Sequence, residues 1–471
     1  MKKAAIINRY PAAPETDYFD EIQRLNHQAN RCVVILDDDP TGNQTVYDVP
    51  VFTTWSKETI VQAFNKNTPV FFILTNSRSL TEKDAMALGK EIATNLINAS
   101  RETNRHFIVI SRSDSTLRGH YPSEVRAMED ILFPQGAVHC LIPAFFQGGR
   151  FTINGIHYVK ENDDLIPASE TPFARDDAFG FNHAELNKWV EEKTGGLVNA
   201  SDVFSIDLEL LRSGGPEKVK EVLLKKFSAS DSSSLKVCTV DALEQSDLNV
   251  FCYAALKAER QGVRFLYRTA ASFINSYVGI KPGLPLKNID MPKDSGNGAL
   301  YIAGSHVPKT TKQIENLIEK TDIIPLEINV QELVHEDQGN SFREKIVERM
   351  NNLLSQGNNL LLYTSRNVLK GKDMEEGLNI GQKISAGLVR ILNDLEIRPK
   401  YILAKGGITS SDLATRGLNV ISATVTGQIL PGVPVWRLGE ETKYPGLSFI
   451  IFPGNVGSVS ALVNVYEKLE K

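Results

Sequence analysis

The sequence has little cysteine, with 4 residues in 471, and they stand singly at Cys32, Cys140, Cys238 and Cys252. No two of them form a CxxC pair, which argues against a disulfide framework and against a cysteine zinc site. The eight histidines also lack the spacing of metal ligands. Scattered cysteines of this kind are typical of small apolar residues in a reduced cytoplasmic protein.

Long apolar runs are also absent. The densest stretches, PVFFIL and LLLY, are the length of a strand, so no membrane-spanning segment is expected. The first residues, MKKAAIINRYP, offer too short an apolar run for a secretory signal. A net charge of −5 gives no reason to expect nucleic acid or a membrane as partner. We therefore expect a cytoplasmic, soluble protein.

Two phosphate-binding motifs are missing. No GxxxxGK[ST] sequence is present, which argues against a P-loop kinase. The segment SGNGALYIAG lacks the GxGxxG spacing and precedes its strand, which argues against a dinucleotide-binding dehydrogenase.

What the chain does have is an alternation of short apolar runs with helical segments. Runs at 31–36, 69–74, 106–111 and 137–143 predict buried strands, and Ser79 with Glu82 predicts a capped helix between two of them. After a Pro-, Gly- and charge-rich stretch the alternation resumes at 299–304 and continues to the C-terminus. This pattern predicts an α/β protein of two domains, each a mainly parallel sheet flanked by helices. The expected boundaries are a first domain at 1–285, a linker at 286–298 and a second domain at 299–471.

Polar residues collect where the predicted strands of the first half end. Asp37, Asp38 and Asp39 follow the first strand, with Thr41 and Gly42 close behind. Adjacent carboxylates repel one another unless a cation or hydrogen bonds offset them, so they predict a site for a sugar hydroxyl, a general base or a metal.

Arginines follow the next two strands. Arg78 comes after Thr75-Asn76-Ser77, and Arg112 and Arg118 flank Asp114, Ser115 and Thr116. Arginine binds planar carboxylates through two parallel hydrogen bonds, so this cluster suits an acidic sugar. The alternative is a loop held by its own arginine–aspartate ion pairs.

Two glycine turns lie in the second half of the chain. One contains Gly406, Gly407, Thr409 and Ser410, and the other contains Gly454, Asn455 and Gly457. Glycine lets backbone amides approach an anion closely, and the start of a helix adds a favourable partial charge. Together the turns predict a nucleotide phosphate site.

A phosphatase of the haloacid-dehalogenase type is a competing interpretation. VVILDDDPT fits its strand-then-DxDxT pattern, with Asp37 as nucleophile and Asp39 as acid/base. Such enzymes also need a later strand ending in paired acids, and VCTVDALEQSD has poor spacing for that role. This alternative also leaves the glycine turns without a function.

Taken together, the clusters resemble the four-carbon acid sugar kinase family from about residue 32 to residue 470. Its DD-x-TG motif is matched from Asp38 to Gly42, and DSTLRG from Asp114 to Gly119. Arg112 replaces the lysine that precedes DSTLRG in the family. At the start of the second domain, Ser305, Thr310 and Gln313 match the family while Val307 replaces a serine. The GG-x-TS and GN-x-G motifs are matched by the two glycine turns.

The resemblance implies a kinase that uses ATP and Mg²⁺, with the acid sugar bound by the first domain and ATP by the second, across a closing cleft. Its substrate would be a tetronate such as threonate, erythronate or an oxo-tetronate. The departures at Arg112 and Val307 suggest a divergent subgroup.

The implied roles can be assigned by residue. Asp38 or Asp39 would orient or deprotonate the accepting hydroxyl, with Asp114 as third candidate. Substrate binding would involve Asp38, Thr41, Arg78, Arg112, Asp114, Ser115 and Arg118, with Arg112 and Arg118 holding the carboxylate. ATP would bind Ser305, Gly406, Gly407, Thr409, Ser410, Gly454, Asn455 and Gly457. Metal ligands are not identified. A homodimer is the default expectation, and a non-catalytic binding or effector protein remains a second hypothesis.

Overall fold

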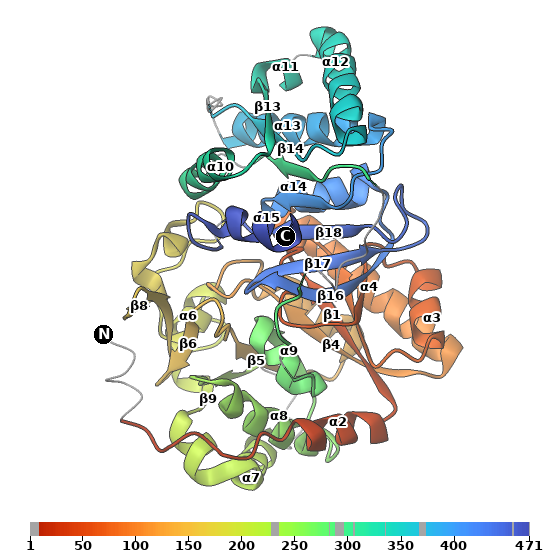
Figure 1. Ribbon diagram of the computed structural model, residues 1–471. Coiled ribbons are helices and arrows are strands. Elements are labelled where there is room, and N and C mark those ends of the chain that lie inside the picture. The colour runs from red at the N-terminus through yellow and green to blue at the C-terminus, as the bar shows by residue number, and fades with distance from the viewer. Residues whose placement is uncertain are drawn as a thin grey trace. The chain divides into compact units, whose positions relative to one another are not determined.

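A computed structural model describes residues 9–227, 235–281, 283–287, 296–304, 307–334, 336–366, 374–454 and 456–470 of the chain (Figure 1). The chain divides into two compact units. Unit 1 comprises Met1–Val46 and Thr54–Pro282, and unit 2 comprises Tyr47–Thr53 and Gly283–Lys471. The short segment Tyr47–Thr53 thus groups with unit 2, although it falls inside the predicted first domain of 1–285.

Unit 1 is built on a parallel sheet with the strand order β3-β1-β4-β11-β5-β10-β9. Its strands are β1 (Arg31–Asp37), β3 (Val70–Leu74), β4 (His106–Arg112), β5 (Val138–Ile142), β9 (Phe204–Ile206), β10 (Lys236–Val240) and β11 (Phe265–Thr269). Apolar side chains fill both faces of the central strands, as expected when helices cover a parallel sheet. The four predicted strands of this half are confirmed. Strands β10 and β11 were not predicted.

Helices of unit 1 pack in two groups, one containing α3, α4 and α5 and the other containing α2, α7, α8 and α9. Their bounds are α2 (Phe19–Gln28), α3 (Lys57–Asn65), α4 (Glu82–Thr103), α5 (Ser123–Leu132), α6 (Leu186–Lys193), α7 (Gly215–Phe227), α8 (Gln245–Glu259) and α9 (Ala271–Val278). The predicted cap of α4 is wrong in detail: the hydroxyl of Thr81, not Ser79, accepts the N–H of Asp84 at 3.2 Å.

A small antiparallel sheet lies in the region 145–235, which follows the last predicted strand of the first domain. It consists of β6 (Arg150–Ile153), β7 (Ile156–Glu161) and β8 (Asp164–Pro167). The carboxylate of Asp241 accepts the backbone N–H groups of Asn154 and Gly155 at 2.7 and 2.9 Å, which holds the β6–β7 turn against the end of β10.

Unit 2 has a mixed sheet in the order β13-β14-β12-β15-β18-β17-β16-β2. Its first five strands are parallel, and β17, β16 and β2 continue it in antiparallel pairs. The strands are β2 (Val49–Phe52), β12 (Leu300–Ala303), β13 (Ile324–Ile328), β14 (Leu360–Thr364), β15 (Ile402–Lys405), β16 (Ser422–Leu430), β17 (Val433–Leu438) and β18 (Ser448–Phe452). The predicted mainly parallel sheets are confirmed, but the antiparallel strands were missed.

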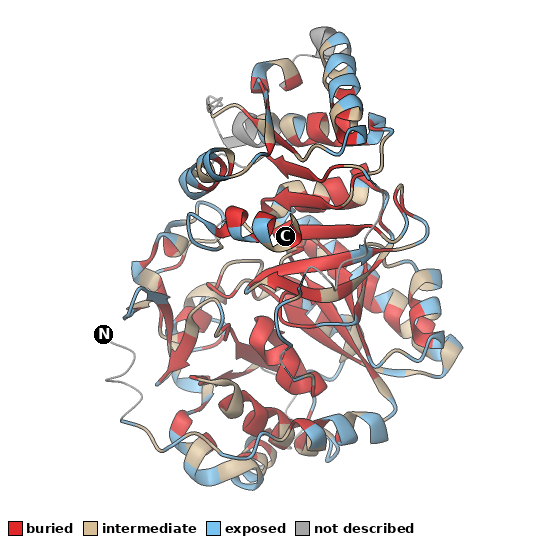
Figure 2. Cartoon of the chain, in the orientation of Figure 1, coloured by how far each residue is buried: buried red, intermediate tan, exposed pale blue. Residues whose placement is uncertain are grey.

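The helices of unit 2 are α10 (Pro308–Lys320), α11 (Val330–Val334), α12 (Glu336–Ser355), α13 (Met374–Asp394), α14 (Gly407–Asp412) and α15 (Ala461–Glu470). Helix α10 starts at Pro308, because proline suits the first helical position. Figure 2 shows most strands of the two large sheets buried, with exposed residues on the outer sides of helices. The polar residues at the strand ends therefore differ from the mainly apolar residues that fill the interior of each unit.

Candidate functional site: the strand ends of units 1 and 2

The first candidate site lies where β1, β3 and β4 of unit 1 end. Parallel pairing aligns Asp37 of β1 with Leu74 of β3 and with Arg112 of β4. The loops that follow these strands therefore start side by side. This places the predicted aspartates and arginines together at one edge of the sheet, the usual position of ligand sites in α/β proteins.

Arg78 links two of the predicted acids. One of its nitrogens contacts Asp39, and Nη1 lies 3.0 Å from Oδ1 of Asp114. Thr41 contributes both its N–H, 2.8 Å from Asp39 Oδ1, and its hydroxyl, 2.5 Å from the same oxygen. Asp39 and Asp114 are therefore held in fixed orientations around one guanidinium.

Arg118 is engaged by protein carboxylates as well. Its Nε donates to Asp114 Oδ2 at 2.9 Å, and its Nη1 lies 3.2 Å from Asp176 Oδ2. Asp114 also accepts the backbone N–H of Thr116 at 3.1 Å. The DSTLRG segment is thus a loop tied by its own ion pairs, as the alternative interpretation expected.

Arg112 occupies a deeper position. Its Nη1 lies 3.2 Å from Asp37 Oδ1 and 3.4 Å from Asp38 Oδ1, and the hydroxyl of Ser113 donates to Asp38 Oδ2 at 2.8 Å. Both aspartates and the arginine are buried. Arg112 and Arg118 were predicted to hold the substrate carboxylate, and that role stays a prediction; both already contact carboxylates of the protein.

Burial and arginine pairing move the pKa values of these acids in opposite directions. Burial raises the pKa of Asp37 to about 8, although Arg112 opposes the shift. For Asp39 and Asp114, burial would also raise the pKa, but Arg78 and the hydrogen bonds outweigh it and the pKa lies below its usual value. The edge therefore combines a carboxyl that favours its neutral form with two that favour the ionised form.

Asp37 is poorly placed for the nucleophile role of the phosphatase interpretation. Its side chain is 0% exposed, and Gly42 lies so close that an added Cβ would stand 1.8 Å from Asp37 Oδ1. A carboxylate enclosed in this way has no path to a phosphate. The glycine of the DD-x-TG motif is explained by this close approach.

The other motif glycine in unit 1 is Gly119. Its φ is +113°, and an added Cβ would lie 3.1 Å from both Arg268 Nη2 and Ser113 Oγ. Leu117, two residues before Gly119, also has a positive φ of 70°. Loop 113–119 thus folds back onto Arg268, a residue that the sequence analysis did not single out.

Two site residues were missed. Arg268 lies in β11, between β4 and β5, and Glu124 lies on α5 with a pKa that burial raises to about 7. A signal for Arg268 exists, because the run FLYRT ends in polar residues just as the predicted strands do. Ser115, which was predicted, is buried and its carbonyl accepts His157 Nε2 at 2.8 Å, a structural contact.

The second candidate site lies at the ends of β15 and β18 in unit 2. These strands are parallel neighbours, and the N–H of Gly406 donates to the carbonyl of Phe452 at 2.8 Å. Nζ of the buried Lys405 donates to the carbonyls of Pro453 and Gly454 at 2.7 and 3.1 Å. The two glycine turns therefore lie together, as the sequence analysis required.

The predicted nucleotide residues of the first turn differ in availability. Gly406 has a φ of +114° and uses its N–H within the unit, while the hydroxyl of Ser410 contacts the carbonyls of Ala404 and Gly406. Gly407 and Thr409 open α14, where the first N–H groups have no acceptor in the helix. Partly exposed Gly407 and Thr409 suit contact with an anion better than Gly406 or Ser410.

Helix α10 supports the second turn. Nε2 of Gln313 donates to the carbonyls of Val456 and Ser458 at 3.1 and 2.8 Å, and the hydroxyl of Thr310 contacts the carbonyl of Gly454 at 3.4 Å. Gly457 has a φ of +82°. The family motif residues on α10 thus fix the shape of the turn. Ser305 and Asn455, also predicted, lie outside the described residues.

Neither unit offers an obvious metal centre. Within the described residues there is no group of three or more His, Cys, Asp or Glu side chains placed to hold a metal ion.

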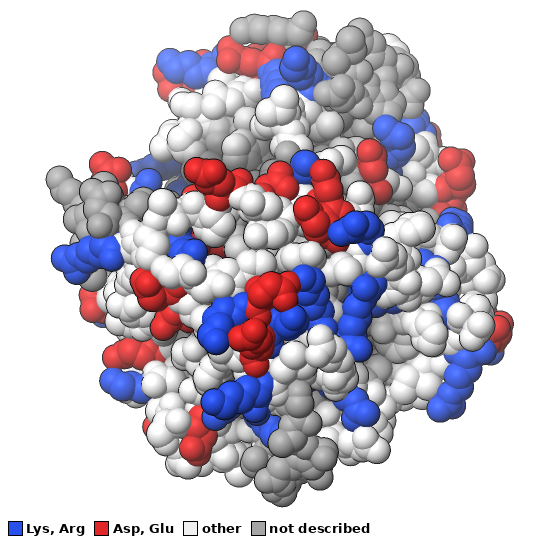
Figure 3. Space-filling model, turned by 90° about the horizontal axis from the view of Figure 1, so that it is seen from below, with Lys and Arg blue, Asp and Glu red and all other residues white. Residues whose placement is uncertain are grey.

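No helix among the described residues is long and apolar enough to span a bilayer. Figure 3 shows acidic and basic side chains interspersed on one face of the molecule.

Residues 33–277 match a protein-family model described as a sugar-binding N-terminal domain, and residues 300–462 match one described as a nucleotide-binding C-terminal domain. The class is therefore a two-domain protein with a sugar-binding and a nucleotide-binding half. More particularly, the chain belongs to the four-carbon acid sugar kinase family.

Individual relatives are distant. A D-erythronate kinase of Heliobacterium modesticaldum is 24% identical over 292 residues, covering 60% of this chain and 59% of that protein. A solved Haemophilus influenzae protein of the DUF1537 family has a TM-score of 0.64 at 18% identity, covering 93% of this chain and 100% of that one. A Salmonella typhimurium structure described as a putative tRNA synthase has a TM-score of 0.64 at 15% identity, covering 92% of this chain and 98% of that one. The two structures establish similarity of fold alone.

Proposed function

We propose that this protein is an ATP-dependent kinase that phosphorylates a hydroxyl group of a four-carbon acid sugar such as erythronate or threonate. Unit 1 would bind the acid sugar and unit 2 the nucleotide. The observation that carries the proposal is the pair of polar sites at strand ends, one rich in acids and arginines and the other made of two adjacent glycine turns. The similarity to a D-erythronate kinase supports the same substrate class.

Asp39 is the favoured base. Its side chain is 19% exposed, compared with 12% for Asp114 and 5% for Asp38, so it is the most accessible of the three candidates. Thr41 and Arg78 fix its orientation, and its lowered pKa keeps it ionised at neutral pH. Asp114, held by two arginines, is the weakest base. Asp38 would bind the substrate together with Thr41 and Arg78.

The proposed step conserves atoms and charge. The substrate hydroxyl oxygen forms a bond to the γ-phosphorus of ATP, the bond from that phosphorus to the bridging oxygen of ADP breaks, and the hydroxyl proton passes to Asp39. Positioning and charge neutralisation supply most of the catalysis in phosphoryl transfer. Mg²⁺ would be held largely by the nucleotide phosphates, as is usual for this ion. Gly407 and Thr409, with the turn from Gly454 to Gly457, would contact those phosphates.

An ADP-release assay against four- and five-carbon sugar acids tests the proposal. We expect turnover with at least one tetronate and a fall of ~10²- to 10⁴-fold in kcat for Asp39→Asn, with ATP affinity nearly unchanged. Unchanged turnover in Asp39→Asn would remove that residue from the base role. Acid binding without ADP release from the wild type would favour the binding-protein hypothesis instead.

A further inference from the structure

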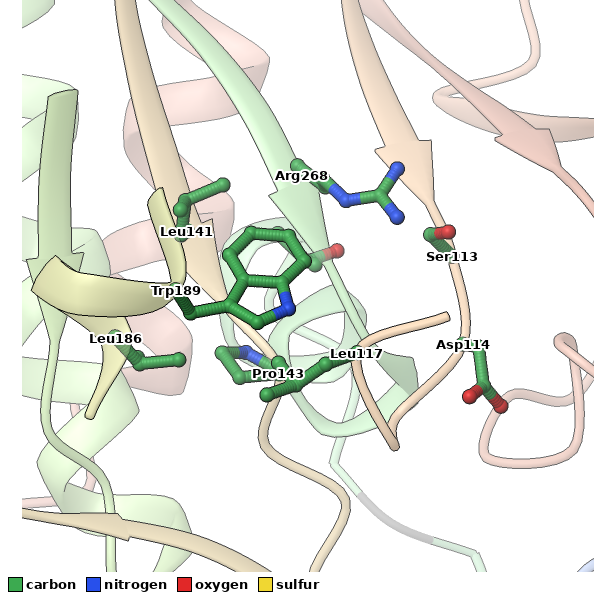
Figure 4. Close-up of a pocket in the computed structure, with 9 residues that line it drawn as sticks. Ser113, Asp114, Leu117, Leu141, Pro143, Leu186, Trp189 and Arg268 are labelled. Atoms are coloured by element: carbon green, nitrogen blue, oxygen red, sulfur yellow. The ribbon is translucent and has the colours of Figure 1, made fainter. Parts of the chain in front are cut away.

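A small pocket in unit 1 lies beside the loop that follows β4, bounded by the ends of β5 and β11 and by α6 (Figure 4). Its empty volume is about 290 Å³, which includes space open to solvent. One wall is apolar, formed by Leu141, Pro143 and Leu186, and Trp189, Arg268 and Thr269 add polar groups. Figure 4 shows Trp189 and Arg268 on two sides of the same space, with Ser113 and Asp114 on the adjoining loop.

Three polar atoms of these pocket residues are buried and unsatisfied. Among the residues that the structure describes, Nη1 of Arg268, Nε1 of Trp189 and Oγ1 of Thr269 have no hydrogen-bond partner. Buried polar groups are almost always hydrogen-bonded, and an orphaned donor loses its hydration without compensation. Three such atoms around one pocket point to a ligand group that completes them.

Arg268 differs from the other arginines of this edge. Arg78, Arg112 and Arg118 each contact an aspartate, whereas Arg268 contacts no carboxylate within the described part of the chain. Its Nη2 donates to the carbonyl of Arg118 at 3.1 Å, and its Cζ lies 5.4 Å from the ring centroid of Tyr121. The residue is 6% exposed, and the charges of Glu124, Asp38 and Asp114 act on it without a direct ion pair among the described residues. A buried guanidinium without a direct carboxylate partner keeps N–H donors that a ligand can use.

We propose that this pocket receives the carboxylate of the acid substrate, with Arg268 supplying the charge and Trp189 and Thr269 supplying further hydrogen bonds. Asp114 lines the pocket as well, and Glu124 and Asp38 also act on Arg268, so the two charges of a phosphate dianion are less favourable there than the single charge of a carboxylate. A carboxylate accepts several hydrogen bonds, so the unsatisfied groups of Arg268, Trp189 and Thr269 suit the acid end of the molecule. The inference rests on the proposed function and reassigns the carboxylate from Arg112 and Arg118 to Arg268.

The test compares the affinity for an acid with the affinity for the corresponding uncharged amide. Binding of D-erythronate and of D-erythronamide is measured by calorimetry for the wild type, Arg268→Met and Arg264→Met. Arg264 precedes β11 at its opposite end, and its exposed side chain donates to Gln135, so it is the matched control. We expect Arg268→Met to weaken D-erythronate roughly 10- to 100-fold and to abolish the preference for the acid. Arg264→Met and the ATP affinity should be unaffected.

A second variant distinguishes a loss of binding from a loss of folding. Trp189→Phe removes the indole N–H and keeps an aromatic ring against Tyr121, whose ring centroid lies 5.1 Å away. It should weaken D-erythronate roughly 5-fold with an unchanged thermal unfolding midpoint. Acid preference retained in both Arg268→Met and Trp189→Phe would overturn the inference, and so would a wild type that does not distinguish acid from amide.

Failure of the kinase proposal gives a different result. If the wild type releases no ADP with any acid of the panel, the proposed function is wrong, yet loss of acid preference in Arg268→Met would still support the pocket. If turnover is seen and Arg268→Met keeps the preference, the kinase proposal stands and the carboxylate pocket is wrong.

Discussion

At the strand ends of unit 1, Arg78, Arg112 and Arg118 each contact an aspartate, whereas at those of unit 2 Lys405 contacts only backbone carbonyls of the neighbouring turn among its described hydrogen bonds. Unit 1 therefore holds its loops with paired charges, whereas Arg268 of the same unit has no direct ion pair among the described residues. Unit 2 holds its turns with hydrogen bonds to the main chain. Most charged motif residues of unit 1 therefore help to hold its loops in place.

The largest effect should come from breaking the charge scaffold of unit 1. Asp114 pairs with both Arg78 and Arg118, so Asp114→Asn leaves two partly buried guanidiniums without this partner. We expect a loss of about 3–5 kcal/mol in the free energy of unfolding, measured by denaturant titration. Asp176→Asn is the control, because Asp176 is more exposed and its ion pair is with Arg118. The asparagine oxygen can still accept the backbone N–H groups of Ala178 and Phe179, so the expected loss is below about 1 kcal/mol. Equal losses in the two variants would contradict the scaffold role.

The two sites could be located from the sequence, but their internal contacts could not. Apolar runs such as 31–36 and 106–111 identify buried strands, and parallel strands bring their following loops to one edge. Which arginine pairs with which aspartate depends on the register of strands far apart in sequence, as with Asp37 and Arg112. Sequence patterns do not carry that information.

Some elements were missed for a related reason. Strand β2 pairs with β16, more than 350 residues later in the numbering, so its place in unit 2 is a long-range property. Strand β11 also begins with an apolar run, but the strands predicted for unit 1 all lie in its first half. Missing β11 also meant missing Arg268.

A smaller effect is expected from the lysine that joins the glycine turns. Lys405→Met removes both hydrogen bonds to the carbonyls of Pro453 and Gly454 and leaves those oxygens without this donor. We expect ATP affinity to fall ~10-fold while affinity for the acid sugar is unchanged, because the acid is assigned to unit 1. Titration calorimetry with each ligand measures both. The control is Lys400→Met, which lies just before β15 and contacts Glu470. An equal loss of acid affinity would contradict the division of roles.

A further expected effect concerns the pH dependence of stability and has opposite signs in the two units. Burial raises the pKa of Asp37 to about 8, so between about pH 4 and 8 the folded state keeps a proton that the unfolded state has released. Stability from this group therefore falls as pH rises, by up to ~1.4 kcal/mol per pH unit. Burial lowers the pKa of Lys405 to about 7, and Lys309 adds to the shift. Between pH 7 and the ordinary lysine value the unfolded state binds the extra proton, so stability from Lys405 rises with pH.

Calorimetric unfolding of single variants between pH 5 and 9 separates these contributions. Asp37→Asn mimics the neutral carboxyl, so it should match the wild type near pH 5 and lose less stability than the wild type towards pH 8. Lys405→Met should lack the stabilisation that the wild type gains above pH 7. If Asp37→Asn kept the full wild-type slope, the aspartate would be ionised when folded, and the Arg112 ion pair would then dominate over burial at this edge.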